Sequence, residues 1–99
     1  MKYNYEFEDI RWQGEIREIS STPDLVELGV QGHGLSLHVI IGKCSQGNFV
    51  WIPEKDAGFA MSCPTDIYWN IEQMTQKMEI YEAMLICQGI SKYYEKMAL

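Results

Sequence analysis

The chain has 99 residues and a net charge of −6, with 46% hydrophobic and 22% charged residues. This length fits one domain, and the composition is that of an ordinary globular protein, which excludes global disorder. The acidic balance argues against direct nucleic-acid binding, because contact with phosphates requires concentrated Lys and Arg, and it favours attraction to a basic partner.

The cellular compartment is predicted from what the sequence lacks. No apolar run reaches the roughly 18 residues of a membrane-spanning helix, so we expect no membrane segment. The first residues, MKYNYEFED, lack the apolar stretch of a signal peptide. The cysteines are odd in number and widely spaced, at Cys44, Cys63 and Cys87. We therefore expect a cytoplasmic protein with free thiols.

The N-terminal segment has the alternation of β-strands. Residues 3–7 alternate between aromatic and polar side chains, which predicts a half-buried strand. After Glu8 and Asp9 the apolar positions shift by one residue. Because side chains in a strand alternate with a period of two, the shift predicts a bulge or a break. Residues 3–19 therefore form either one long bent strand or two short ones.

The middle of the chain alternates strands and short turns. Pro23 stops a ladder, and Gly32 and Gly34 suit a tight turn. The strands predicted between these turns span residues 26–30, 35–41 and 48–52, with a possible short edge strand around 59–61. Consecutive short connections indicate an antiparallel meander.

The C-terminal third is helical. Thr65 or Asp66 can cap a helix over residues 67–74, and a longer helix is predicted from about 76 to 97. Gly89 is expected to weaken the second helix by about 1 kcal/mol relative to Ala. The sequence thus predicts a single α+β domain over residues 1–99, in which a four- or five-stranded antiparallel meander packs against two C-terminal helices.

Residues with catalytic or metal-binding potential have simpler structural explanations. The loop over residues 42–48 lies between two strands, whereas a phosphate-binding loop precedes a helix. Glu54 and Asp56 are expected to be solvated loop residues, and Asp66 is expected to cap a helix. The metal-capable side chains lack the spacing of a zinc site; they are His33, His38, Cys44 and Cys63. A nucleophilic cysteine needs a nearby His and an orienting acid; Cys44 could pair with His38, but it has only turn neighbours, and a plain thiol is the commoner case. We therefore expect no metal, no cofactor and no catalysis.

Aromatic side chains are more numerous than a small core easily hides. The sequence has three Trp and six Tyr, and the adjacent Tyr93 and Tyr94 cannot both face the sheet. Exposed aromatics beside acids suit a protein interface, whereas simple core filling is the open alternative.

A resemblance covers the middle of the chain most strongly. It rests on Gly42-Lys43, Gly47-Asn48, Ile52-Pro53, Gly58 and the segment Asp66-Ile67-Tyr68-Trp69-Asn70-x-Glu72. These features resemble a family of uncharacterised bacterial proteins of about this length, seen in Firmicutes and their mobile genetic elements. The family has no established activity, so the resemblance implies no catalytic residue. Small acidic proteins on such elements include anti-CRISPR inhibitors, and this chain is similar to them in size, charge and context.

The expected function is therefore non-catalytic binding to a basic nucleic-acid-binding protein, such as a Cas nuclease or its guide-loading surface. The predicted contact residues are the acids Glu6, Glu8, Asp9, Glu15, Glu18 and Glu27, with Trp69, Tyr93 and Tyr94 as an aromatic alternative. Two other classes stay open: a small-ligand-binding domain or small enzyme with a pocket between sheet and helix, and a toxin–antitoxin or subunit-assembly module. The oligomeric state is also open, and a dimer is one of the possibilities.

Overall fold

The computed structural model describes residues 1–45, 47–61 and 63–98. The strands are β1 (Lys2–Phe7), β2 (Ile10–Ser21), β3 (Leu25–Gly32), β4 (Leu35–Cys44), β5 (Gly47–Ile52) and β6 (Ala57–Met61). The helices are α1 (Ile67–Met74) and α2 (Ile80–Ala98), and a short 3-10 turn, η1 (Pro53–Lys55), links β5 to β6.

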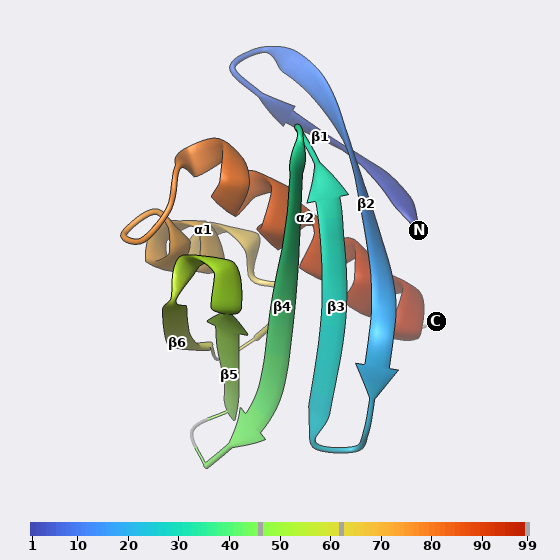
Figure 1. Cartoon of the computed structure of the whole chain (residues 1–99), viewed down its shortest axis with the longest axis vertical. Coiled ribbons are helices and arrows are strands. Elements are labelled where there is room, and N and C mark those ends of the chain that lie inside the picture. The colour runs from blue at the N-terminus through green and yellow to red at the C-terminus, as the bar shows by residue number, and fades with distance from the viewer. Residues whose placement is uncertain (46, 62, 99) are drawn as a thin grey trace.

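The strands form one antiparallel sheet in the order β1-β2-β3-β4-β5-β6, so each strand pairs with its neighbour in sequence (Figure 1). This confirms the predicted antiparallel meander and the α+β class. The predicted number of four or five strands is wrong, because the described residues form six. The N-terminal segment contains two separate strands, and the segment at 57–61 pairs fully with β5.

The chain reverses direction at Glu8 and Asp9. Their φ angles are 53° and 61°, and Phe7 pairs with Ile10 across the turn. Two successive positive φ values are typical of a type I′ turn, whose twist suits a hairpin. The shift in apolar phase therefore marks a break between two strands, which was one of the two predicted alternatives, and not a bulge. A register shift does occur further along β2, between Glu18 and Ser20 where it pairs with β3.

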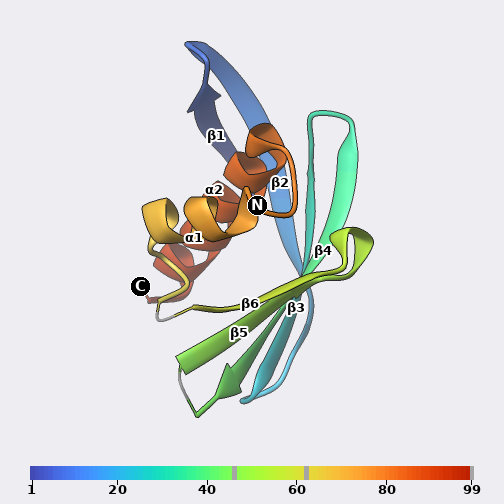
Figure 2. The same cartoon turned by 90° about the vertical axis from the view of Figure 1, so that its left-hand side faces the viewer.

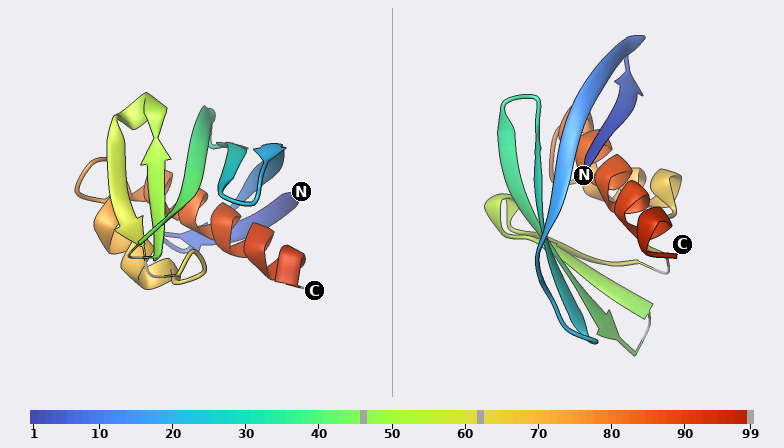
Figure 3. Two further views of the ribbon diagram at one scale, coloured as in Figure 1. Left: turned by 90° about the horizontal axis from the view of Figure 1, so that it is seen from below. Right: turned by 90° about the vertical axis from the view of Figure 1, so that its right-hand side faces the viewer.

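Both helices lie against one face of the curved sheet and leave the other face uncovered (Figures 2 and 3). Helix α1 begins as predicted, because the Asp66 carboxylate accepts a hydrogen bond from the Trp69 N–H at 3.2 Å. Helix α2 begins four residues later than the predicted position 76, at Ile80. Glu82 reaches back to accept from the Glu79 N–H at 3.3 Å, which is half of a capping box and fixes this start.

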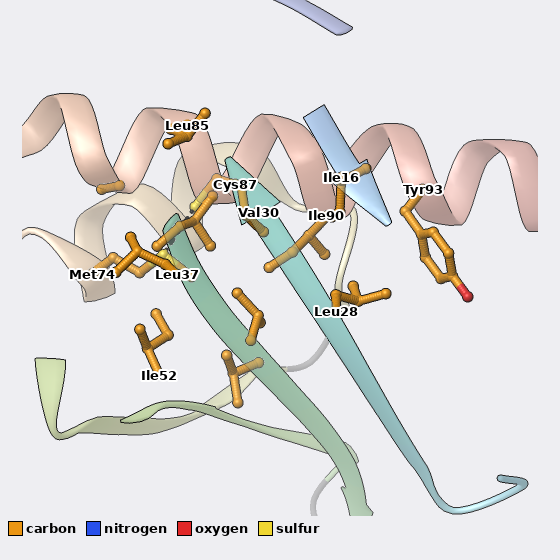
Figure 4. Close-up of a cluster of buried hydrophobic side chains, with 14 of the residues drawn as sticks. Ile16, Leu28, Val30, Leu37, Ile52, Met74, Leu85, Cys87, Ile90 and Tyr93 are labelled. Carbon is orange, nitrogen blue, oxygen red and sulfur yellow. Dashed lines mark hydrogen bonds between the residues drawn. The ribbon is translucent and has the colours of Figure 1, made fainter. Parts of the chain in front are cut away.

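The core fills the space between the sheet and α2 (Figure 4). It combines the inward side chains of the strands with one side of α2 and with Met74 at the end of α1. Its fully buried members include Ile16, Leu28, Val30, Val39, Val50, Ile52, Met74, Leu85, Ile86 and Ile90. Burying side chains of this size contributes about 1.5–3 kcal/mol each, so this layer dominates the stability of the fold.

Tyr3 fixes α2 to the first two strands. Its phenol hydroxyl donates a hydrogen bond to the carbonyl oxygen of Leu85. Its ring lies between Gly14 and Gly89, where an added Cβ would come within 2.5 Å and 3.1 Å of the Tyr3 Cζ atom respectively. Gly89 is therefore required by packing rather than being only a weak point of the helix.

An ion pair ties the β5–β6 connection to α2. The Lys55 ammonium contacts the carboxylate of Glu82, which is buried. A buried carboxylate is costly unless it is paired, so this contact holds η1 close to the start of α2. Neither of the helices in the described ranges is long and apolar enough to span a membrane.

Candidate functional site

The uncovered face of the sheet, here called the outer face, carries large apolar side chains. An antiparallel sheet with one solvated face normally places polar residues there. Instead, Ile19, Leu25, Phe49 and Trp51 are exposed by 43%, 45%, 45% and 42%. Together with the half-buried Ile40, these residues are called the outer apolar patch.

Strand pairing brings most of these residues together on β3 to β5. Ile40 lies opposite Trp51, and Trp51 lies opposite Gly58. In the next row, Gly42 lies between Leu25 on β3 and Phe49 on β5. Directly opposed residues on one face of a sheet are about 5 Å apart, so their side chains form a continuous surface.

Glycines allow the apolar side chains of the patch to lie close to the backbone of the sheet. A Cβ added to Gly58 would lie 2.8 Å from Cζ of Phe49 and 3.6 Å from Cδ1 of Trp51, so both rings lie close to the backbone there. A Cβ added to Gly29 would lie 3.3 Å from Cδ1 of Ile19, which places Ile19 on the same face. These apolar side chains therefore pack close to the backbone of the outer face.

A hydrogen-bonded contact between His38 and Glu54 bounds the patch at the C-terminal end of β5. The strand ends at Ile52, so the backbone N–H of His38 on β4 has no strand partner beyond that point. The Glu54 carboxylate accepts from this N–H at 2.6 Å and contacts the His38 Nδ1 atom at 2.8 Å. Although partial burial opposes ionisation, these hydrogen bonds with His38 lower the pKa of Glu54.

The surroundings of the patch are acidic. Three carboxylates lie on its rows or next to them, those of Asp24, Glu27 and Glu54, against the cations of Arg17 and Lys43. Hydrophobic centres with polar rims are typical of protein interfaces. A negative rim favours a partner whose own rim is positive.

The predicted acidic contact residues do not form one surface. Glu6, Glu8 and Asp9 gather at the β1–β2 hairpin, where Glu6 Oε1 lies 3.6 Å from Arg11 Nη2. Strand alternation places Glu15 and Glu27 on the outer face, as expected. Glu18 is also exposed to solvent, but it pairs with Leu28 and therefore lies on the helix side of the sheet. There, burial and the nearby Glu18 carboxylate raise the pKa of Tyr93 to about 12.

The predicted aromatic surface is largely inside the protein. Tyr93 is only 8% exposed, which departs from the expected exposed position. Tyr94 and Trp69 are half-buried and pack against the core, and the rings of Tyr93 and Tyr94 meet edge to face at 5.4 Å. The surplus aromatics instead emerge as Phe49 and Trp51 on the outer face. A sequence signal existed: residues 49–52 are all apolar, which indicates a strand that is apolar on both sides.

A family of unknown function (DUF6618) matches residues 1–98 of this sequence. The chain belongs to this family. The expectation of an uncharacterised family is thereby confirmed. No curated protein and no solved structure matches the chain.

The other candidate catalytic and metal-binding residues of this DUF6618 chain lie apart from one another. His38 and Cys44 lie six residues apart on β4, a separation of about 20 Å along a strand, so they cannot act as a pair. The three cysteines, all within the described ranges, form no disulfide. The hydroxyl of Thr65 contacts the Cys63 sulfur at 3.0 Å and lowers the pKa of that thiol. The described residues contain no group of His, Cys, Asp and Glu able to hold a metal ion.

The centre of the space between the sheet and the helices is filled by side chains. The side chains there are core residues with little or no exposure, such as Leu28, Val39 and Ile86. The clefts found among the described residues lie at the margins, for example beside Tyr93 and Met97. The outer apolar patch is therefore the surface on which a functional interpretation can best be built.

Proposed function

We propose that this protein is a non-catalytic binding domain that docks on a basic surface of another protein through the outer apolar patch. The observation that supports this most strongly is the exposure of Leu25, Phe49 and Trp51 together on one sheet face. Contiguous exposed apolar surface of this kind marks interaction sites. Aromatic side chains near the centre of such a surface supply much of the binding energy.

Charge complementarity defines the partner. The net charge of −6 and the acidic rim attract a positively charged surface and speed the encounter. The partner that fits best presents an apolar protrusion flanked by Lys and Arg. The protrusion would rest on Phe49 and Trp51, and the cations would face Glu27 and Glu54.

Nucleic-acid-handling proteins are the main class with such basic surfaces. Among them, a Cas nuclease holds its nucleic acids in a positively charged channel. The family resemblance and the acidic charge together favour this target, so we propose an inhibitor of the anti-CRISPR type. It would act by occupying the channel or the guide-loading surface, without any chemical step.

The test measures binding to a purified Cas nuclease, with and without guide RNA, together with DNA cleavage. Three forms are compared: wild type, the double variant Phe49→Ser with Trp51→Ser, and the control Tyr68→Ser. Tyr68 is 89% exposed on α1 and lies outside the patch, so it controls for loss of an exposed aromatic. Removing two central aromatics is expected to weaken binding by about 30-fold or more, which corresponds to about 2 kcal/mol. Tyr68→Ser is expected to bind like wild type.

The outcomes separate the partner from the surface. If the protein does not bind the nuclease with or without guide RNA, and DNA cleavage is complete at excess protein, the Cas target is rejected. Binding that survives the double variant would reject the outer apolar patch. If reversal of Glu6, Glu8 and Asp9 to Lys abolishes binding while the double variant does not, the contact lies at the β1–β2 hairpin instead.

A further inference from the structure

Strand β1 forms one edge of the sheet, and its free side is beside α2 (Figure 3). The hydrogen bonds at its start show which residues face outward along that edge. Ile16 N–H donates to the Met1 carbonyl at 2.8 Å, and the Met1 nitrogen donates to the Ile16 carbonyl at 2.7 Å. In an antiparallel pair, hydrogen-bonded positions alternate, so Lys2, Asn4 and Glu6 direct their backbone groups away from β2.

The free edge is accessible. A cleft of about 530 Å³ lies between it and α2, and it is lined by Asn4, Tyr5, Glu6, Arg11, Gln88 and Lys92. The Tyr5 hydroxyl is buried beneath this region and has no hydrogen-bond partner in the described part of the chain. An edge strand of this length without proline or a bulge is a template for another strand.

We propose that a second copy of this chain pairs with β1 and forms a symmetric dimer. The two β1 strands would run antiparallel, with Asn4 opposite Asn4, so that six strands from each copy form one continuous sheet. Each copy would contribute the outward backbone groups of Lys2, Asn4 and Glu6 to the new ladder. This inference is independent of the proposed function, since it concerns another edge of the molecule.

The charges of β1 specify this arrangement. With Asn4 at the centre, Lys2 of each copy lies opposite Glu6 of the other. The pairing of β1 with β2 extends the pattern, because Glu6 lies beside Arg11 and Lys2 beside Glu15. Each of the two rows beside the central Asn4 row therefore contains Arg11 and Glu6 of one copy followed by Lys2 and Glu15 of the other. The charges alternate in sign along this row.

The central row of side chains and the alternative registers of the β1–β1 pair both favour the register that is centred on Asn4. The central row contains only amides, from Gln13 and Asn4 of each copy. Centring the pair on Lys2 or on Glu6 would place like charges opposite each other, which is destabilising. Opposite charges in both outer rows offset part of the repulsion between two copies of net charge −6.

The experiment is sedimentation equilibrium of the purified protein across concentrations, with Asn4→Pro and Asn4→Ala as a matched pair. Proline at an outward edge position removes the free N–H without breaking the ladder to β2. We expect a wild-type dimer, a dissociation constant raised at least tenfold by Asn4→Pro, and little effect of Asn4→Ala. Urea unfolding checks that both variants fold.

A charge swap gives a second test that leaves the backbone unchanged. Lys2→Glu should weaken the dimer at least tenfold, because it places two carboxylates opposite each other in each outer row. Adding Glu6→Lys should restore it to within about threefold of wild type. A protein that is monomeric at all concentrations, a dimer unaffected by Asn4→Pro, or a swap that fails to restore association would overturn the proposal. Dissociation by Trp51→Ser alone would assign self-association to the outer apolar patch.

Discussion

Gly89→Ala tests whether packing or helix propensity decides the middle of α2. On propensity alone, alanine stabilises a helix interior by about 1 kcal/mol relative to glycine. The structure predicts the opposite sign. A Cβ at Gly89 would lie 2.8 Å from the Tyr3 hydroxyl oxygen, 3.1 Å from Cζ and 3.2 Å from Cε1. The ring has little room to retreat, because its Cζ atom already lies 2.5 Å from the position that a Cβ at Gly14 would occupy.

The magnitude follows from two opposing effects. Inserting a methyl group into a packed core costs typically about 1–3 kcal/mol. Subtracting the helix-propensity gain of about 1 kcal/mol leaves a net destabilisation of up to about 2 kcal/mol. For a domain of this size, each kcal/mol lowers the melting temperature by about 4–8 °C, so the change is measurable.

Urea unfolding followed by circular dichroism measures the effect in Gly89→Ala, Tyr3→Phe and the double variant. Tyr3→Phe removes the atom nearest to the new methyl group, so the double variant should lose less stability than the sum of the single changes. Gln88→Ala on the adjacent position reports propensity alone. A Gly89→Ala protein more stable than wild type, or purely additive effects, would refute the placement of the Tyr3 ring.

Two further predictions concern the β1–β2 turn and Glu54. Replacing Glu8 by Asn and Asp9 by Gly should raise the free energy of unfolding by about 1–2 kcal/mol, since both residues have positive φ; unchanged or reduced stability in urea would contradict the type I′ turn. The hydrogen bonds from His38 lower the pKa of Glu54 from 4.5, so its contribution is present above that pH and lost as pH falls through the lower folded value. Glu54→Gln should therefore reduce the loss of unfolding free energy as the pH falls through this range. If the pH dependence of the unfolding free energy at acid pH is unchanged, the contact between Glu54 and His38 does not form.

Alternation and turn chemistry were sufficient to predict much of the fold. The inward faces of β3 and β4 and the start of α1 follow from residue pattern and the Asp66 cap. The strand count was wrong because Glu8 and Asp9 are not typical residues of a two-residue hairpin turn. Without Asn or Gly there, a reversal cannot be distinguished from a bulge by the shift in apolar phase.

The candidate site was less predictable, because burial depends on the whole fold. The acids were correctly identified as surface residues, but register shows that Glu18 belongs to the helix side, away from Glu27. Tyr93 and Trp69 resemble exposed aromatics in sequence, yet they lie beside or within the core. Only cross-strand pairing reveals that Phe49 and Trp51 share a face with Leu25, a residue more than twenty positions earlier in the chain.

The two proposed surfaces are compatible in one assembly. The outer apolar patch lies mainly on β3 to β5, whereas the dimer edge is β1, so pairing two β1 strands leaves both patches uncovered. The two-fold axis of an antiparallel strand pair is perpendicular to the sheet, so both outer faces would point in the same direction. A partner could have two basic sites separated by the same distance as the two patches. Binding at the first site would then hold the second patch near the second site, at an effective concentration set by the dimer. Under this arrangement Asn4→Pro weakens binding to a bivalent partner without touching the patch, whereas Trp51→Ser weakens each site in monomer and dimer alike.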